Sequence, residues 1–196
     1  MMRFKKQFSM KMTTIAGVIA VSCCGVAGIA GASDGTITFE GKIQAVTCVI
    51  TGGTDTGSLS DTADFTVNLP YVSTTALAKE GARAGDTKFV IQLSGAECAN
   101  NKVANVVFES AQSNVDTTTG KLINTVTKAQ GGSENVQIAI LNNDKKDLNL
   151  TNNAKHQQVT IANNKALFEY WAQYYATNIV TAGAVQSQAL YSISYN

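Results

Sequence analysis

The pattern of hydrophobic and polar positions along this chain indicates short β-strands rather than helices. It is clearest in residues 34–43, DGTITFEGKI, where apolar or small residues occupy every second position and polar residues lie between them. The apolar face consists of Ile37, Phe39, Gly41 and Ile43. A period of two puts alternate side chains on opposite faces of a strand, so this segment predicts a strand with one buried face.

Further segments of this kind follow, separated by clusters such as QGGSEN and NNDKKD that are rich in turn-forming residues. The predicted strands span residues 37–49, 65–69, 87–93, 105–109, 136–141, 158–161, 167–177 and 184–195. A brief helical turn is expected near residues 75–79. Many short strands with frequent turns predict one antiparallel sandwich or barrel.

The last two predicted strands alternate most clearly. In LFEYWAQYYAT the aromatic residues Phe168, Tyr170 and Tyr174 share one face, and polar residues lie on the other. A helix competes for this window, but aromatic residues that alternate with polar ones favour a half-buried strand. In QALYSISYN one face carries Ala189, Tyr191, Ile193 and Tyr195. Together with residues 34–43, this last segment predicts an amphipathic strand on each side of the predicted core strands.

Residues 1–32 have the composition of a cleaved export signal. Basic residues precede an apolar run at about residues 15–29, and the tripeptide AGA at residues 30–32 fits a cleavage site. A membrane anchor is the alternative, but the run is shorter than the roughly 20 residues that a spanning helix needs. We therefore expect the mature chain to begin at Ser33.

Four cysteines are present, and the export signal contains Cys23 and Cys24. A lipid anchor at Cys23 is a further alternative, because the preceding residues resemble a lipoprotein cleavage box. After cleavage at residue 33 only Cys48 and Cys98 remain, and in an oxidising compartment they are expected to form a disulfide. Closing a loop of roughly 50 residues lowers the entropy of the unfolded chain, and in this description it raises the free energy of unfolding by about 4 kcal/mol.

Composition narrows the function classes. The 196 residues carry a formal net charge of +1 and 15% charged residues, which argues against a nucleic acid or an anionic membrane as partner. The single histidine, His156, lies in the polar run NNAKHQQ and is predicted to be a solvated loop residue. The motifs of serine hydrolases, zinc proteases and P-loop enzymes are absent. We expect no catalytic residue, metal ion or cofactor.

Several features, taken in order, resemble the pilins assembled by the chaperone–usher pathway, particularly the major rod subunit. They are the alternating segment ahead of Cys48, Cys98 at the end of VIQLSGAEC, the VNLP segment, the late aromatic strand, Gly183 fourteenth from the end and the penultimate Tyr195. The resemblance covers essentially the whole mature chain.

The resemblance implies an all-β fold, an incomplete immunoglobulin-like β-sandwich that is completed by a donor strand from another subunit. It divides the chain into a signal peptide (residues 1–32), an N-terminal donor-strand extension (33–47) and a pilin domain (48–196). The donor-strand residues would be Ile37, Phe39, Gly41 and Ile43.

The resemblance also implies partners. They are identical or related pilin subunits in a head-to-tail polymer, a periplasmic chaperone and an outer-membrane usher, and the assembled fimbria at the cell surface could meet a host receptor. The residues expected to face the chaperone and usher are Gly183, Tyr191, Ile193 and Tyr195.

Two other interpretations remain open from the sequence. A secreted lectin or adhesin with a complete sandwich would begin with an amphipathic strand that pairs within its own molecule. Such a protein would bind sugar as a stable monomer. A minor tip-adaptor pilin would share the end motifs of a rod subunit, although the single-domain length and low charge suit repeated stacking.

Overall fold

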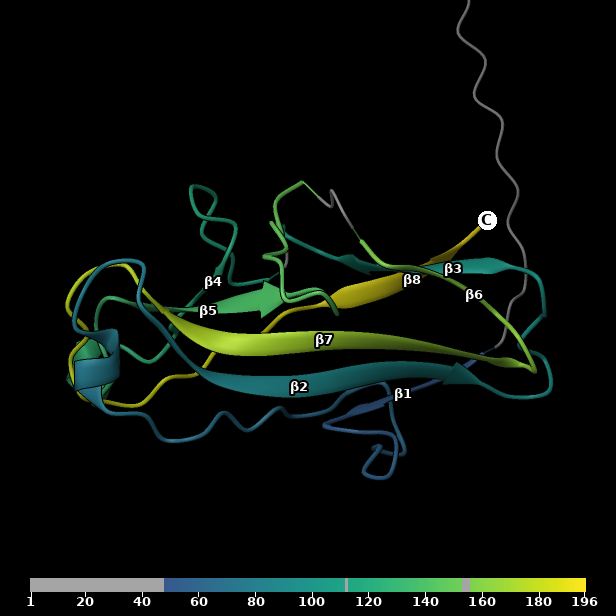
Figure 1. Ribbon diagram of the computed structural model, residues 1–196, viewed down its shortest axis with the longest axis horizontal. Helices are drawn as coiled ribbons and strands as arrows, with labels where there is room; N and C mark the ends of the chain where they lie inside the picture. Colours follow the sequence, from purple (N-terminus) through teal and green to yellow (C-terminus); the bar gives the residue numbers. More distant parts are fainter. Residues whose placement is uncertain (1–47, 112, 153–155) are drawn as a thin grey trace, which may run out of the picture. The chain divides into compact units, whose positions relative to one another are not determined.

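The computed structural model describes residues 48–111, 113–152 and 156–196, and they form two antiparallel β-sheets (Figure 1). The larger sheet has the order β1 (Val49–Gly53), β2 (Arg83–Ser94), β7 (Lys165–Ala176), β5 (Val136–Leu141) and β4 (Leu122–Ile123). The smaller sheet has the order β6 (Gln158–Thr160), β3 (Val103–Phe108) and β8 (Tyr191–Tyr195). Two short 3-10 helices, η1 (Thr74–Leu77) and η2 (Lys128–Gln130), lie in the connections.

The two longest strands, β2 and β7, form the centre of the larger sheet and lie side by side (Figure 1). Their register places Phe89 opposite Tyr170, and both side chains point into the core. These two rings stack at a centroid distance of 5.4 Å, and Phe108 from β3 meets Tyr170 edge-on at 5.6 Å. Aromatic contacts therefore join the inner faces of the two sheets.

The alternation in the sequence correctly predicted most of these strands. β2, β3, β5, β6 and β7 confirm the segments predicted at 87–93, 105–109, 136–141, 158–161 and 167–177, and η1 confirms the helical turn. The predicted strand at 37–49 lies outside the described residues except for its last two positions.

The sequence prediction missed β1, because its residues VITGG look like the start of a turn. Its glycine Gly52 is part of the ladder, opposite Ile91 of β2. A Cβ atom at Gly52 would lie 2.2 Å from the ring of Phe65. Gly52 therefore makes room for an aromatic side chain that lies across the strand.

The predicted disulfide between Cys48 and Cys98 is present. It joins the start of β1 to the loop that follows β2, across a sequence separation of 50 residues. Cys98 is fully buried. The bond therefore holds the edge strand β1 against the centre of the larger sheet.

We expect the variant Cys48→Ala/Cys98→Ala to lose about 4 kcal/mol of unfolding free energy, because its unfolded chain is no longer constrained by the closed loop. Urea unfolding of the monomeric chain measures the loss. Reduction of the wild-type protein is the control and should lower its stability to a similar extent. Equal stability of the oxidised wild type and the variant would contradict the prediction.

A charged cluster on the larger sheet ties three segments together. Arg83 donates from both terminal nitrogens to the two carboxylate oxygens of Asp147, at 2.6 and 2.7 Å. Lys121 approaches the same carboxylate at 3.3 Å, and the ring of Tyr175 contacts both cations. The hydrogen bonds from Arg83 are the main cause that lowers the pKa of Asp147 below its ordinary value.

This shift predicts a pH dependence for Asp147→Asn. Because the folded pKa is depressed, the stabilisation by Asp147 is complete above the unfolded value of about 3.9 and is lost as pH falls through the folded value. The variant should therefore be less stable than the wild type at pH 7, and the difference should shrink as the pH approaches 3. Urea unfolding of both proteins from pH 7 to pH 3 measures this difference in unfolding free energy. A difference that does not change with pH would argue against the role given to Asp147.

Candidate functional site

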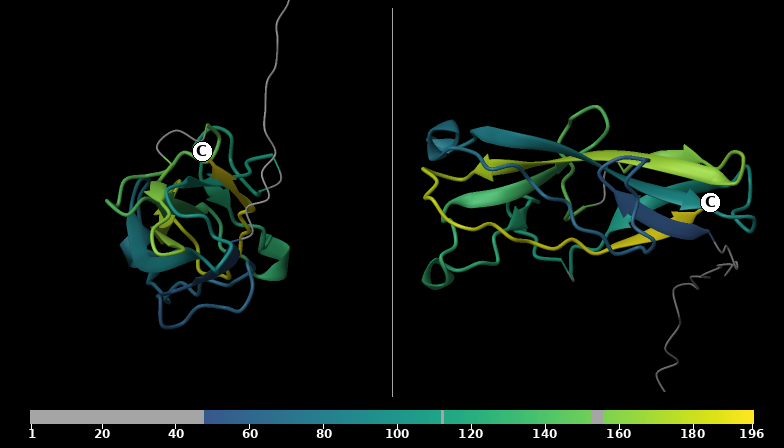
Figure 2. Two further views of the ribbon diagram at one scale, coloured as in Figure 1. Left: turned by 90° about the vertical axis from the view of Figure 1, so that its right-hand side faces the viewer. Right: turned by 90° about the horizontal axis from the view of Figure 1, so that it is seen from below.

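An open groove with a volume of about 1380 Å³ runs along the core of the described domain. We call residues 64–72, which follow β1, the β1-side wall, and residues 184–190, which lead into β8, the β8-side wall. Both are drawn as thin coil in the second view of Figure 2. The floor is apolar and includes Phe89, Ile91, Phe108, Leu122, Ile138, Ile140 and Ala172.

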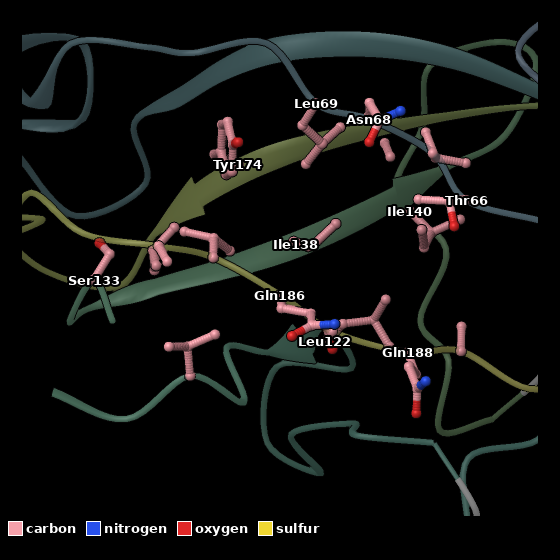
Figure 3. Close-up of a pocket in the computed structure, with 18 of the residues that line it drawn as sticks. Thr66, Asn68, Leu69, Leu122, Ser133, Ile138, Ile140, Tyr174, Gln186 and Gln188 are labelled. Atoms are coloured by element: carbon pink, nitrogen blue, oxygen red, sulfur yellow. The ribbon is translucent and has the colours of Figure 1, made fainter. Parts of the chain in front are cut away.

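Figure 3 shows how the labelled residues surround this groove. Asn68 and Leu69 of the β1-side wall lie along its upper side, and Gln186 and Gln188 of the β8-side wall lie along its lower side. Ile138, from β5, lies between them. The groove is therefore a channel with two backbone edges and a hydrophobic base.

The β1-side wall has the side-chain pattern of a strand without its hydrogen bonds. Phe65, Val67 and Leu69 are half-buried and pack on the main core, whereas Thr66 and Asn68 between them are exposed. Among the described residues, no backbone–backbone hydrogen bond links residues 64–72 to another segment. The strand predicted at 65–69 is thus extended but unpaired, so the prediction was wrong about the ladder.

The β8-side wall is paired along one edge. The carbonyl oxygens of Ala184, Gln186 and Gln188 accept hydrogen bonds from Ser133, Thr125 and Asn114, at 2.9, 2.8 and 3.3 Å. The alternate residues, at 185, 187 and 189, make no backbone–backbone hydrogen bond within the described part of the chain. Of the strand predicted at 184–195, only Tyr191–Tyr195 is paired as a strand.

Alternate residues of an extended chain direct their backbone groups to opposite sides. The free N–H and C=O groups of the β8-side wall therefore face away from the segment that already pairs with it, toward the groove. The β1-side wall offers a second set of unpaired groups across the apolar floor. Two such edges are a template for an added strand, which would satisfy both at once.

Tyr191 closes one end of the groove. Its hydroxyl donates to the carbonyl oxygen of Ala63 at 2.7 Å, and its ring meets Phe65 edge-on with centroids 6.4 Å apart. Burial is the main cause that raises the pKa of Tyr191, and the nearby Asp64 adds to it. The neutral hydroxyl therefore bridges the two walls at this end.

A second hydrophobic cluster lies at the other end of the groove. It is built on Leu77 and Val180, against which Val72 of one wall and Val185 of the other pack. The β1-side wall thus runs from Ala63 toward this cluster, and the β8-side wall runs from the cluster toward Tyr191. Because the walls are antiparallel, a strand between them would be parallel to one and antiparallel to the other.

The structure brings only some of the predicted site residues to the groove. Gly183 and Tyr191 line it. Ile193 and Tyr195 lie in β8, opposite Val106 and Ala104 of β3, and pack against the main core. The donor-strand residues Ile37, Phe39, Gly41 and Ile43 lie outside the described residues. The roles of these residues toward partner proteins stay predictions.

The prediction for His156 was wrong, because this residue is half-buried rather than solvated. Its Nδ1 atom bonds to the carbonyl oxygen of Val106, and its ring lies 6.0 Å from that of Phe108. The polar run around it gave no sign of this packing. His156 therefore packs against β3 and does not line the groove.

Within residues 48–111, 113–152 and 156–196, no cluster of three or more His, Cys, Asp or Glu side chains could hold a metal ion. The same residues include no helix of the length and apolarity needed to cross a membrane.

The family model described as "Fimbrial protein" matches residues 37–196, which is most of the chain. The chain belongs to the fimbrial protein family. This fimbrial protein is 41% identical over 171 residues to the F17 fimbrial protein of Escherichia coli, covering 84% of this chain and 88% of the relative. It is 39% identical over 174 residues to the major fimbrial subunit SMF-1 of Stenotrophomonas maltophilia strain K279a, covering 85% and 95%.

Solved structures support the fold of this fimbrial protein. The P pilus rod subunit PapA matches with a TM-score of 0.53 at 16% identity, covering 76% of this chain and 99% of PapA. A subunit in the structure of a chaperone–usher pilus matches with a TM-score of 0.52 at 16% identity, covering 84% and 96%. The fold is the predicted incomplete all-β sandwich, and as a fimbrial subunit the protein is exported to the cell surface.

A test of the groove wall in this fimbrial protein uses Gly183, which lies against the loop that follows η2. A Cβ atom at Gly183 would lie 2.4 Å from the backbone nitrogen of Ser133 and 2.5 Å from the carbonyl carbon of Gly132. Gly183→Ala should therefore push these two segments apart and cost about 1–3 kcal/mol of unfolding free energy.

Gly57→Ala is the matched control, because its added Cβ would meet only the side-chain oxygen of Asp55, at 3.3 Å. Thermal and urea unfolding of both variants measure the difference. If Gly183→Ala were as stable as Gly57→Ala, the close backbone approach at Gly183 would not constrain the wall.

Proposed function

We propose that this protein is a structural, noncatalytic subunit of a chaperone–usher fimbria that polymerises by donor-strand exchange into the pilus rod and supports bacterial adhesion. The observation that carries the proposal is the groove, whose apolar floor lies between two unpaired backbone edges. A subunit with this groove needs one more strand to complete its fold. The proposed occupant is the segment at residues 33–47 of another copy.

The chemistry of this segment fits the groove. Ile37, Phe39 and Ile43 supply apolar side chains at every second or fourth position, and burying each contributes about 1.5–3 kcal/mol. Hydrogen bonds from its backbone to the two walls add about 1 kcal/mol apiece. Gly41 suits a place where the groove is shallow or a backbone comes close. Residues 37–43 and the β8-side wall at 184–190 also have equal lengths, so one can pair with the other throughout.

Strand addition to an exposed edge is the known mode of chaperone–pilin complementation, and we carry it over to this chain. In our proposal a periplasmic chaperone first fills the groove and holds the C-terminal region, which includes Gly183, Tyr191, Ile193 and Tyr195. At the outer-membrane usher, the next subunit replaces the chaperone's strand. Each copy then offers one strand and accepts another, and such a head-to-tail contact propagates as a filament.

The names of the relatives favour a rod subunit over the alternatives. SMF-1 is called a major fimbrial subunit, and PapA is called a rod subunit. A secreted lectin with a complete sandwich would not need an open groove of this length. A minor tip adaptor would share the groove, so the abundance of the protein along the fibre distinguishes it from a rod subunit.

The test uses Phe39→Asp and its neighbour Thr38→Asp in cells that express the full chain with its own chaperone and usher. The two variants carry the same charge on opposite faces of the proposed donor strand. Phe39→Asp should abolish surface fibres because it would bury a carboxylate in the apolar groove, whereas Thr38→Asp should assemble normally. Electron microscopy and the amount of surface polymer measure the outcome.

Two results would overturn the proposal. One is normal fibres from Phe39→Asp, and the other is normal fibres from a chain that lacks residues 33–47 but keeps its export signal.

A further inference from the structure

Asn124 is bound through its side chain to four backbone groups from three separate segments. Its Nδ2 donates to the carbonyl oxygens of Ser133 at 2.9 Å and Ala184 at 3.0 Å. Its Oδ1 accepts from the N–H groups of Val126 at 3.1 Å and Gln186 at 3.0 Å. Both donors and both lone pairs of the amide are used, which is the full capacity of an asparagine side chain.

These bonds lie where the β8-side wall has no regular partner strand. In a regular ladder a neighbouring backbone carbonyl would accept from the N–H of Gln186, but here the acceptor is the side chain of Asn124. The same replacement occurs further along the wall, where Ser113 Oγ accepts from the N–H of Leu190 at 2.8 Å. The side chain of Asn124 therefore fixes both residues, Ala184 and Gln186, that flank Val185 of the wall.

The orientation of Val185 matters because its backbone groups face the groove. Thr125 also bonds to the carbonyl of Gln186, through its N–H at 2.8 Å and its Oγ1 at 2.9 Å, but it makes no bond to Ala184. Among the described residues, Asn124 is the side chain that bonds to the wall on both sides of Val185. Without Asn124, Ala184 and Gln186 would keep their bonds to Gly131, Ser133 and Thr125, but the N–H of Gln186 would lose its acceptor and the backbone at Val185 would be less tightly fixed.

We infer that Asn124 is a positioning residue for strand addition, which sets the backbone of the β8-side wall at Val185 so that an incoming strand can pair with it. The inference rests on the proposed function. Asn124 itself need not touch the incoming strand, because it acts through the wall. It would affect the part of the donor that lies against Val185 and leave the rest of the groove unchanged.

The variant Asn124→Asp tests this role because it keeps the shape of the side chain. It would replace the donating nitrogen by an oxygen that faces the carbonyls of Ser133 and Ala184. Asn164→Asp is a matched control. Asn164 Nδ2 also donates to two backbone carbonyls, those of Ala96 at 3.3 Å and Cys98 at 2.8 Å, and Asn164 does not line the groove.

The measurement is the binding of a fluorescent peptide with the sequence of residues 33–47 to the full mature chain. The chain carries Phe39→Asp so that its own extension does not compete. Asn124→Asp should weaken binding about tenfold, which corresponds to the loss of one or two backbone hydrogen bonds between wall and peptide. Asn164→Asp should bind like the parent chain, even if both variants lose stability.

A second series locates the effect along the donor. Peptides with Ile37, Phe39 or Ile43 replaced singly by Ala are measured against the parent chain and Asn124→Asp. A positioning role predicts coupling between Asn124→Asp and one of the three peptide positions, the one that lies against Val185. A purely structural role predicts equal weakening for all peptides.

The outcomes separate the inference from the proposed function. Equal peptide binding by the Asn124→Asp and Asn164→Asp chains, or coupling spread evenly over the three positions, would overturn the role of Asn124 and leave the proposed function intact. If the parent chain did not bind the peptide at all, both the proposed function and the role of Asn124 would be overturned.

Discussion

The structure depends on one constraint: two backbone edges face each other across an apolar floor, and the described residues place no strand between them to pair with their N–H and C=O groups. Buried peptide groups need hydrogen-bond partners, and an open apolar groove leaves hydrophobic side chains in water. The β1-side wall and the β8-side wall both have the residues of strands but lack part of the ladder. A single added strand would satisfy both edges and cover the floor, so completion from outside is the central property of this fold.

The rest of the domain keeps this groove open and in shape. The floor rests on β2 and β7, whose aromatic contacts with β3 hold the two sheets together. The disulfide fixes β1 beside β2, and the pair of Arg83 and Asp147 ties a loop to the same sheet. The walls lack a regular strand ladder. In the β8-side wall, the N–H of Gln186 bonds to the side chain of Asn124 instead of to a neighbouring strand. A floor built on paired strands with incompletely paired walls suits a site that accepts an added strand.

In the proposed function, a polymer follows because each subunit has both an extension and a groove. The contact is heterologous, since the surface that donates a strand is different from the groove that accepts it. In this proposal, growth continues at one end of the chain of subunits. In this respect the family membership, the missing ladder and the apolar pattern of residues 37–43 support the same function.

The sequence by itself determined which side chains face the core, because period-two alternation is a local property of the chain. It was enough to predict β2, β5 and β7, and the position of Cys48 and Cys98 outside the predicted export signal was enough to predict their disulfide. It could not predict that Gly52 belongs to β1, that His156 packs on Phe108, or that Asn124 bonds to Gln186. Only the tertiary structure decided that residues 64–72 and 184–190 lie on opposite sides of the groove, with facing edges that pair with no other segment of the described chain. The physical reason is that a strand's own residues specify its buried face, whereas its hydrogen-bond partner is chosen by segments far away in the chain.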